Sequence, residues 1–281
     1  MIPSFLWEFT GRAEEKRKQD AMDLTIDGKA IYYKVTGDPD QDKTVVILQG
    51  WGTKCSLYDN TAKFLSDQYR VIQFDFPGFG NSEEPDEAWD VEHYVDFFLK
   101  FMKALDIHHA ILMGHSYGGR VIIRLSARHQ EDFRIDRIVL VDSAGILPVK
   151  TPKQLRKIRR YKRMKKLMNT RLLNEFFPDL VEDWKSRQGS ADYRNATPIM
   201  RKALVMAVNE DLSDKLPLVR EDTLLVWGDQ DTATPLSDGQ KMEKEIPNAG
   251  LTVIPNTGHF SFLENQPLFF RILGSYLKGE A

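Results

Sequence analysis

Short apolar runs bounded by turn residues recur along the chain from residue 24 onward. Two of them read TVVIL at residues 44–48 and VIQF at residues 71–74. Runs that are apolar at nearly every position are typical of strands buried on both faces of a parallel sheet. Similar runs occupy residues 110–113, 138–141, 223–227 and 251–254. The pattern therefore predicts one mostly parallel sheet.

The first predicted strands form a hairpin. Residues 24–26 and 31–35 flank the pair Asp27-Gly28, and Asp-Gly between two strands is a strong signal for a two-residue turn. Residues 11–23 are highly charged, and we expect them to be helical or mobile.

Segments with helical periodicity separate the later strands. In residues 91–105, one helical face carries Val91, Val95, Phe98, Met102 and Leu105, as expected of an amphipathic helix. Further helices are predicted over residues 61–69, 120–128, 238–245 and 268–277. Strands that alternate with helices indicate an α/β fold with helices on both faces of the sheet.

One long segment, residues 148–215, breaks this alternation and is predicted to contain helices only. It holds 17 lysine and arginine residues against 8 aspartate and glutamate residues, whereas the remainder of the chain holds 22 against 33. We interpret this basic insert as a lid between two parts of the core, residues 1–147 and 216–281.

The first part of the insert is a basic amphipathic segment. Residues 153–173 contain no acidic residue. Apolar residues recur there at helical spacing: Leu155, Ile158, Tyr161, Met164, Met168 and Leu172. The simplest interpretation is a lid helix whose apolar face covers the site while its charges are solvated. Two other hypotheses stay open, namely attraction of anionic substrates and weak contact with an anionic membrane surface.

Composition places the chain among ordinary globular proteins, with 42% hydrophobic residues, 28% charged residues and a net charge of −2. We therefore expect no nucleic-acid partner. No apolar run reaches the roughly 18 residues of a membrane span, and the N-terminus lacks the features of a signal peptide. Cys55 is the only cysteine and is interpreted as a packed side chain. A single cysteine, no signal peptide and no membrane span together predict a cytoplasmic location.

The segment Gly114-His115-Ser116-Tyr117-Gly118 fits the G-x-S-x-G pattern between a predicted strand and a predicted helix. A serine on this sharp turn is presented at the carboxyl edge of the sheet as a nucleophile. The Tyr117 amide then lies at a helix N-terminus, where it can stabilise an anion.

A nucleophilic serine needs a base, and the base needs an orienting acid. His259 follows the last predicted strand, whereas His115 is committed to the turn itself. Asp231 follows the penultimate strand, so that the chain order is serine, acid, histidine. Asp142, after an earlier strand, is the rival acid, and Asp229 is expected to cap its turn.

An oxyanion hole needs two preorganised backbone donors. Tyr117 supplies one, and the loop Gln49-Gly50-Trp51-Gly52 should supply the other through the Trp51 amide. The chain shows no HExxH, cysteine–histidine, Walker or strand-linked GxGxxG pattern, so we expect neither a metal nor a cofactor.

Six motifs in order carry a resemblance to the α/β-hydrolase superfamily, in its small lidded bacterial serine hydrolase branch. They are QGWG, DFPGFGNS, GHSYGG, VLVDSAG, WGDQD and GHFSFLENQP. The resemblance implies an eight-stranded, mostly parallel sheet with a lid inserted after the sixth strand. One departure is Gln49, where the family usually has histidine.

The resemblance also bears on the substrate. Dehalogenases and epoxide hydrolases of this superfamily carry aspartate in place of Ser116. Carbon–carbon hydrolases typically have asparagine before the serine and tryptophan soon after the histidine, whereas this chain has His115, Phe260 and Phe262. We therefore predict hydrolysis of a small ester, thioester or lactone through an acyl-enzyme on Ser116. Carbon–carbon or amide hydrolysis, and a non-catalytic ligand-binding role, remain the alternatives.

Overall fold

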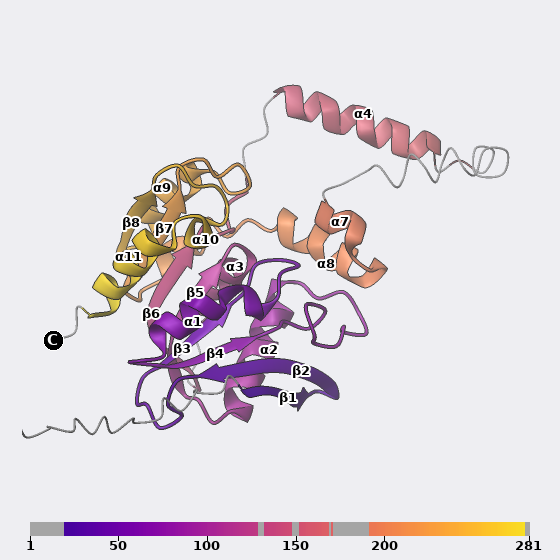
Figure 1. The fold of residues 1–281 in the computed structure, drawn as a ribbon. Coiled ribbons are helices and arrows are strands. Elements are labelled where there is room, and N and C mark those ends of the chain that lie inside the picture. The colour runs from indigo at the N-terminus through magenta and orange to yellow at the C-terminus, as the bar shows by residue number, and fades with distance from the viewer. Residues whose placement is uncertain (1–19, 129–131, 148–151, 169, 171–190, 279–281) are drawn as a thin grey trace, which may run out of the picture.

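The computed structural model describes residues 20–128, 132–147, 152–168, 170 and 191–278 (Figure 1). Eight strands form one sheet in the order β1-β2-β4-β3-β5-β6-β7-β8. In chain order they are Asp20–Ile26, Lys29–Thr36, Thr44–Leu48, Arg70–Phe74, His109–His115, Arg134–Val141, Thr223–Gly228 and Ala249–Ile254. Strands β3 to β8 pair in parallel, and β1 and β2 pair antiparallel at one edge. The predicted α/β fold with a mostly parallel eight-stranded sheet is confirmed.

Helices cover both faces of the sheet, as predicted. On one face lie α2 (Val91–Ala104), α3 (Tyr117–Ser126) and α9 (Leu236–Glu245), and on the other lie α1 (Asp59–Leu65) and α11 (Gln266–Lys278). Shorter elements are η1 (Cys55–Tyr58), η2 (Leu216–Leu218) and α10 (Ser261–Glu264).

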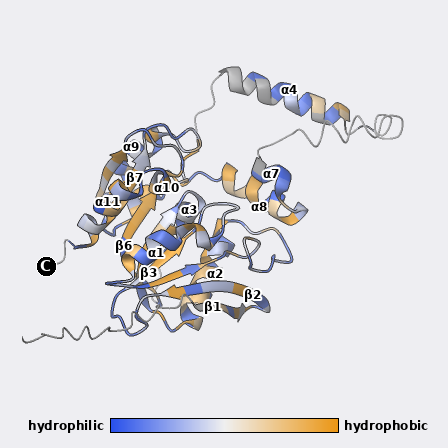
Figure 2. Cartoon of the chain, in the orientation of Figure 1, coloured by the Kyte–Doolittle hydropathy of each residue, from blue (hydrophilic) through white to orange (hydrophobic). Residues whose placement is uncertain are grey.

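Strand β3 shows why the central runs are apolar throughout. Its residues Val46 and Leu48 pack against the core on the α2 and α3 side, and Val45 and Ile47 pack against the core on the α1 and α11 side. Successive side chains of a strand point to opposite faces, so a strand covered on both sides needs apolar residues at every position. Figure 2 shows the result, since the central strands are mostly orange.

The N-terminal hairpin is longer than the sequence pattern indicated. Strand β1 begins at Asp20, which pairs with Val35 of β2. The expectation of a helical or mobile segment is therefore wrong for residues 20–23, because they pair with β2 at the edge of the sheet. The rest of that segment lies outside the described residues. The turn is as predicted, with positive φ at Asp27 and Gly28.

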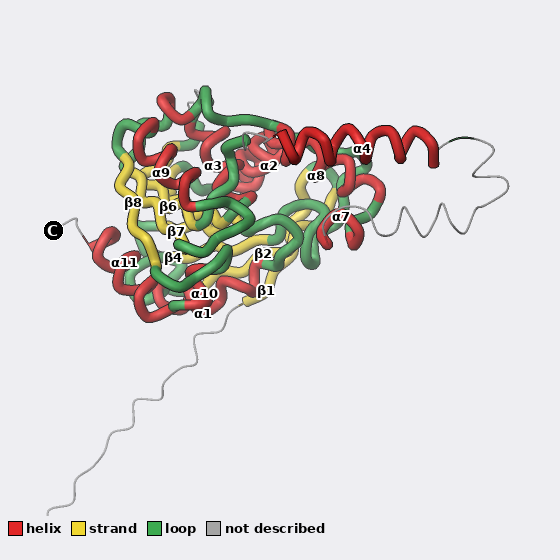
Figure 3. The backbone as a smooth tube through the Cα atoms, turned by 90° about the horizontal axis from the view of Figure 1, so that it is seen from above, coloured by secondary structure: helices red, strands yellow, loops and turns green. Residues whose placement is uncertain are grey.

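The insert after β6 is helical in its described parts. It contains α4 (Pro152–Met168), α7 (Ala191–Asn195) and α8 (Pro198–Asn209). Helix α8 packs on the body of the protein, where Met200 and Ala207 join the larger core. Helix α4 extends beyond the body in both views of the chain (Figures 1 and 3). The insertion point after the sixth strand is thus confirmed.

Strand order also locates the site. From β3 the chain moves outward to β4 on one side, then returns to β5 on the other side of β3. The loops that follow β3 and β5 therefore leave the sheet side by side, and such switch points are where α/β sheets bind ligands.

Candidate active site

Ser116 occupies a strained turn between β5 and α3. Its backbone has φ 50° and ψ −108°, a region that non-glycine residues rarely adopt. Two hydrogen bonds to the β6 segment hold it, from Ser116 N–H to the Val141 carbonyl and from Ala144 N–H to the Ser116 carbonyl, each 3.0 Å. Position 118 requires glycine because the β3 backbone approaches it closely. A Cβ atom there would lie 2.1 Å from the Leu48 carbonyl oxygen.

The structure brings the three predicted side chains into one hydrogen-bonded row. His259 Nε2 lies 2.9 Å from Ser116 Oγ, and His259 Nδ1 lies 2.8 Å from Asp231 Oδ2. These residues follow β5, β7 and β8 and lie 143 and 28 positions apart in the chain. Only the fold of the sheet can place them together.

The Asp231 carboxylate is buried and fully hydrogen-bonded. Its Oδ1 accepts the backbone N–H groups of Ala233 and Thr234, and its Oδ2 lies 2.7 Å from Thr234 Oγ1 in addition to His259. Burial alone would raise the pKa of Asp231, but the hydrogen bonds from His259 and Thr234 outweigh it and lower that pKa below its ordinary value. The carboxylate is therefore ionised at neutral pH.

Asp142, the rival acid, serves a different set of partners. Its Oδ1 accepts the Gly228 N–H at 2.8 Å, and its Oδ2 accepts the backbone N–H and the hydroxyl of Ser261 at 3.0 and 2.6 Å. Burial raises the pKa of Asp142 to about 6 despite these bonds. This side chain joins the ends of β6 and β7 to the start of α10.

Asp229, expected to cap its turn, accepts the Thr257 N–H at 3.3 Å. That bond ties the turn after β7 to the turn after β8, which carries His259. A structural role, as predicted, fits this contact.

The loop of residues 49–52, here called the oxyanion loop, lies against the serine turn. A Cβ atom on Gly50 would lie 2.7 Å from His115 Nδ1 and 3.5 Å from Ser116 Cβ, so only glycine allows this approach. The ring of Trp51 packs edge-on against that of Tyr117, with centroids 5.0 Å apart. As the first residue of α3, Tyr117 also has no acceptor for its N–H within the helix.

Gln49 supports this loop from inside. Its side chain is buried, and Nε2 donates a 2.6 Å hydrogen bond to the Thr53 carbonyl. The usual histidine of the family is thus replaced by an amide that still braces the loop.

Tyr58, which the sequence did not single out, and His115 of the serine turn complete the framework of the site. The Gly50 N–H donates to the Tyr58 hydroxyl at 3.0 Å, and that hydroxyl lies 3.0 Å from His115 Nδ1. His115 Nε2 lies 2.8 Å from the His259 carbonyl oxygen. Burial, followed by the nearby His259 ring, lowers the pKa of His115 to about 3, so its imidazole is neutral.

A cavity of about 240 Å³ adjoins the oxyanion loop beneath the insert. Its wall includes Trp51, Phe79, Asp192, Asn195 and Met200. Both polar and apolar side chains therefore face this cavity.

Comparison with known proteins identifies the family. The family model described as alpha/beta hydrolase fold matches residues 43–266. The chain belongs to this family. A 2-hydroxymuconate semialdehyde hydrolase of Pseudomonas sp. (strain CF600) is 30% identical over 227 residues, which cover 76% of this chain and 78% of that protein.

Solved structures share the fold. The enol-lactonase from Burkholderia xenovorans LB400 superposes with a TM-score of 0.70 at 21% identity, covering 91% of this chain and 99% of the other. The esterase from Exiguobacterium antarcticum superposes with a TM-score of 0.67 at 23% identity, covering 90% and 97%. The chain is a hydrolase-family protein, and these neighbours span more than one kind of substrate.

None of the described helices has the length and apolarity needed to span a bilayer. No group of three or more histidine, cysteine, aspartate or glutamate side chains suited to a metal ion occurs among the described residues.

Proposed function

We propose that this protein is a serine hydrolase that cleaves a small ester, thioester or lactone through an acyl-enzyme on Ser116. The observation that carries the proposal is the continuous row from Ser116 Oγ through the His259 ring to the Asp231 carboxylate, with contacts of 2.9 and 2.8 Å. Nucleophile, base and orienting acid need this geometry for acyl transfer.

The first half of the reaction forms the acyl-enzyme. His259 Nε2 takes the Ser116 hydroxyl proton while Oγ attacks the substrate carbonyl carbon. The resulting oxyanion accepts hydrogen bonds from the Trp51 and Tyr117 amides. Protonated His259 then gives its proton to the departing oxygen or sulfur, and the tetrahedral intermediate collapses to the ester of Ser116.

The second half reverses these roles with water. His259 removes a proton from water, which attacks the acyl carbon, and the proton then returns to Ser116 Oγ as the acid leaves. Asp231 stays ionised, holds the His259 Nδ1 proton and stabilises the imidazolium in both halves. No step calls for a metal or cofactor.

Carbon–carbon or amide hydrolysis on the same three residues is the main alternative, and one relative at 30% identity is a 2-hydroxymuconate semialdehyde hydrolase. Two side chains beside the site favour the ester class. His115 precedes the serine and Phe260 follows the base, whereas carbon–carbon hydrolases typically carry asparagine and tryptophan there.

Turnover of p-nitrophenyl esters from acetate to laurate tests the ester class. We expect the rate to peak at one acyl length and to vanish in Ser116→Ala. Serine-independent turnover, or no turnover of any ester, would contradict the proposal. Fluorophosphonate labelling of Ser116 without ester turnover would instead favour a carbon–carbon or amide substrate, and failure to label would favour a ligand-binding role.

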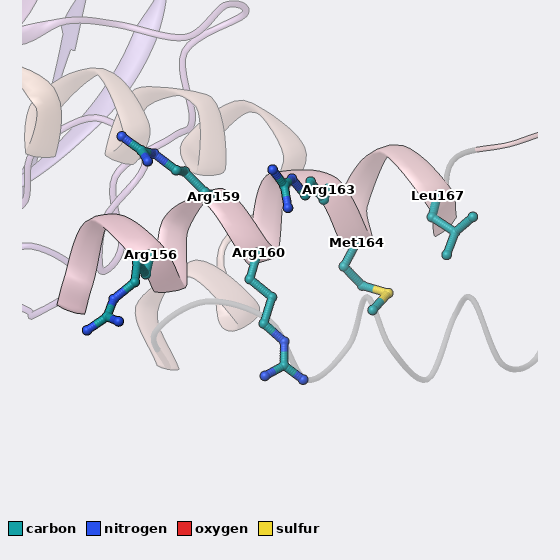
Figure 4. Close-up of a pocket in the computed structure, with 6 residues that line it drawn as sticks. All are labelled: Arg156, Arg159, Arg160, Arg163, Met164 and Leu167. Atoms are coloured by element: carbon teal, nitrogen blue, oxygen red, sulfur yellow. The ribbon is translucent and has the colours of Figure 1, made fainter. Parts of the chain in front are cut away.

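We also propose that the insert rests on an anionic membrane surface through α4. Every charged side chain of α4 is basic, and Tyr161 and Leu167 are exposed at 40% and 52%. Four arginines, Arg156, Arg159, Arg160 and Arg163, line one surface of the helix together with Met164 and Leu167 (Figure 4). A helix that shows both cations and apolar side chains to solvent matches the interface of an anionic bilayer better than a small anionic substrate. The extension of α4 beyond the body in Figures 1 and 3 supports the same choice.

A further inference from the structure

We propose that His115 and Tyr58 are positioning residues that lock the oxyanion loop and the base to each other through one buried imidazole. This inference rests on the proposed function, because it assigns the framework of that same site. The contacts run from the Gly50 N–H, through the Tyr58 hydroxyl and the His115 ring, to the His259 carbonyl oxygen.

The chemistry of the two ends sets the direction of every hydrogen bond. The His259 carbonyl can only accept, so His115 Nε2 must carry the ring proton. Since the imidazole is neutral, Nδ1 is then an acceptor and receives the Tyr58 hydroxyl proton. The Tyr58 oxygen in turn accepts the Gly50 N–H. Reversing one link would leave two donors or two acceptors facing each other in a buried space.

Burial and ring packing hold this row in place. The exposed fractions of Tyr58 and His115 are 0% and 1%. The Tyr58 ring stacks on Phe262 with centroids 5.0 Å apart and planes 7° from parallel. Phe262 belongs to α10, directly after the His259 segment, so that η1, β5 and α10 form one rigid cluster around the row.

Each end of the row is next to a group of the proposed reaction. Gly50 precedes Trp51, whose amide is the proposed oxyanion donor. The His259 carbonyl belongs to the same residue as the proposed base. Preorganised donors act only when they are aimed at the developing oxyanion before the reaction begins, and the row fixes donor and base in a common frame.

Three substitutions separate the links. Tyr58→Phe keeps the ring and its stacking but removes the hydroxyl. His115→Gln places an amide donor near the Nε2 position and so keeps the bond to His259 while losing the bond to Tyr58. His115→Asn places an amide oxygen near the Nδ1 position and does the reverse. The matched control is Tyr69→Phe, which removes the hydroxyl of another buried tyrosine, bonded to the Leu277 carbonyl at 3.3 Å.

We expect Tyr58→Phe to lower kcat on the best ester by about 10-fold, less than the roughly 100-fold or greater loss caused by removing an oxyanion donor itself. KM should stay within about twofold, because the row is proposed to align donors toward the developing oxyanion and not toward the substrate in its ground state. Tyr69→Phe should leave both parameters near the wild-type values.

A double-mutant cycle provides the decisive measurement. In the His115→Gln background, Tyr58→Phe should cost nothing further, because the bond is already lost. In the His115→Asn background it should again cost about 10-fold, because the asparagine oxygen still accepts from Tyr58. A merely structural role would give equal losses in all backgrounds.

Two results would overturn the inference: a Tyr58→Phe kcat within twofold of wild type, or a Tyr58→Phe loss in the His115→Gln background equal to that in wild type. These failures are distinct from failure of the proposed function, in which wild-type protein would hydrolyse no ester or Ser116→Ala would retain turnover. If the His115 variants do not fold, the near-isosteric Tyr58→Phe, set against Tyr69→Phe, still decides the question.

Discussion

At the scale of single residues, two buried aspartates near the site differ in their hydrogen-bond partners. Asp231 faces the imidazole of His259, whereas Asp142 faces backbone and hydroxyl donors of Gly228 and Ser261. The chain order of serine, acid and histidine already favours Asp231 as the acid that orients His259. The partners of Asp142 escaped the sequence because Ser261 lies 119 positions away from it, and the motif GHFSFLENQP that contains Ser261 does not indicate which carboxylate the serine contacts.

The first prediction follows from the different partners of the two aspartates. Asp231→Asn should lower kcat by about 10⁴-fold, because the amide favours the wrong tautomer of His259. Asp142→Asn should retain most of the activity but lose about 1–3 kcal/mol of unfolding free energy, since it leaves buried donors facing an amide. Steady-state kinetics and thermal melts of both variants check this. Retained turnover in Asp231→Asn would assign the orienting role elsewhere.

The raised pKa of Asp142 predicts a pH dependence of stability. Its pKa is about 6 in the folded protein against an ordinary value of 3.8, so between these pH values the folded state binds more protons than the unfolded state. This aspartate should therefore cost stability as pH rises from about 4 to about 6, by up to roughly 3 kcal/mol. Urea unfolding at pH 4, 5, 6 and 7 should show wild type losing stability relative to Asp142→Asn across this interval. A difference that is constant with pH would contradict the assignment.

At the scale of elements, α4 differs from every other described helix in its charge. The sequence predicted a basic amphipathic helix over residues 153–173, and α4 covers Pro152–Met168. Of the remaining predicted residues only 170 is described. The sequence could not decide where this helix sits, because periodicity gives the faces of a helix and not its distance from the body. Figure 3 shows it projecting past the sheet.

The proposed membrane contact predicts a charge-dependent binding of vesicles. Wild type should sediment with phosphatidylglycerol vesicles at low salt and not with phosphatidylcholine vesicles. Each basic side chain near an anionic surface contributes about 1 kcal/mol. A variant of α4 that lacks four of its basic side chains should therefore bind at least about 100-fold more weakly. That variant replaces four residues by glutamine: Arg156, Arg159, Arg160 and Arg163.

The matched control removes the same charge from other exposed positions. It replaces by glutamine Lys63, Lys103, Arg220 and Lys244. Binding by the control near the wild-type level would place the contact on α4. Equal weakening of both variants would indicate a general charge effect, and absence of binding by wild type would contradict the proposal. Competition of vesicle binding by an anionic polynucleotide at equal phosphate would favour a nucleic-acid partner instead.

At the scale of the whole molecule, sheet topology explains how distant residues meet. The serine turn follows β5 and the oxyanion loop follows β3, and these strands are neighbours although β4 lies between them in sequence. The acid and the base follow β7 and β8, farther along the same edge. Apolar runs and helical periods sufficed to predict this architecture, because strands buried on both faces leave a plain pattern.

The sequence also sufficed to single out Ser116, His259 and Asp231, the proposed nucleophile, base and acid, because each directly follows a predicted strand in a recognisable motif. It did not reveal Tyr58 or Thr234 as partners of the site. Tyr58 lies in a short helix with no motif of its own, 57 positions before His115, and Thr234 is an ordinary turn residue. The start of β1 at Asp20 was missed because charged residues carry no strand pattern when their strand lies at an edge.

Covalent labelling of Ser116 tests the central claim most directly. Purified wild type and Ser116→Ala would be incubated with an alkyl fluorophosphonate and weighed intact by mass spectrometry. The row of Ser116, His259 and Asp231 predicts one phosphonyl adduct per wild-type chain, located on Ser116, and none in the variant. An unlabelled wild type, or an adduct that persists in Ser116→Ala, would contradict the assignment of Ser116 as an activated nucleophile.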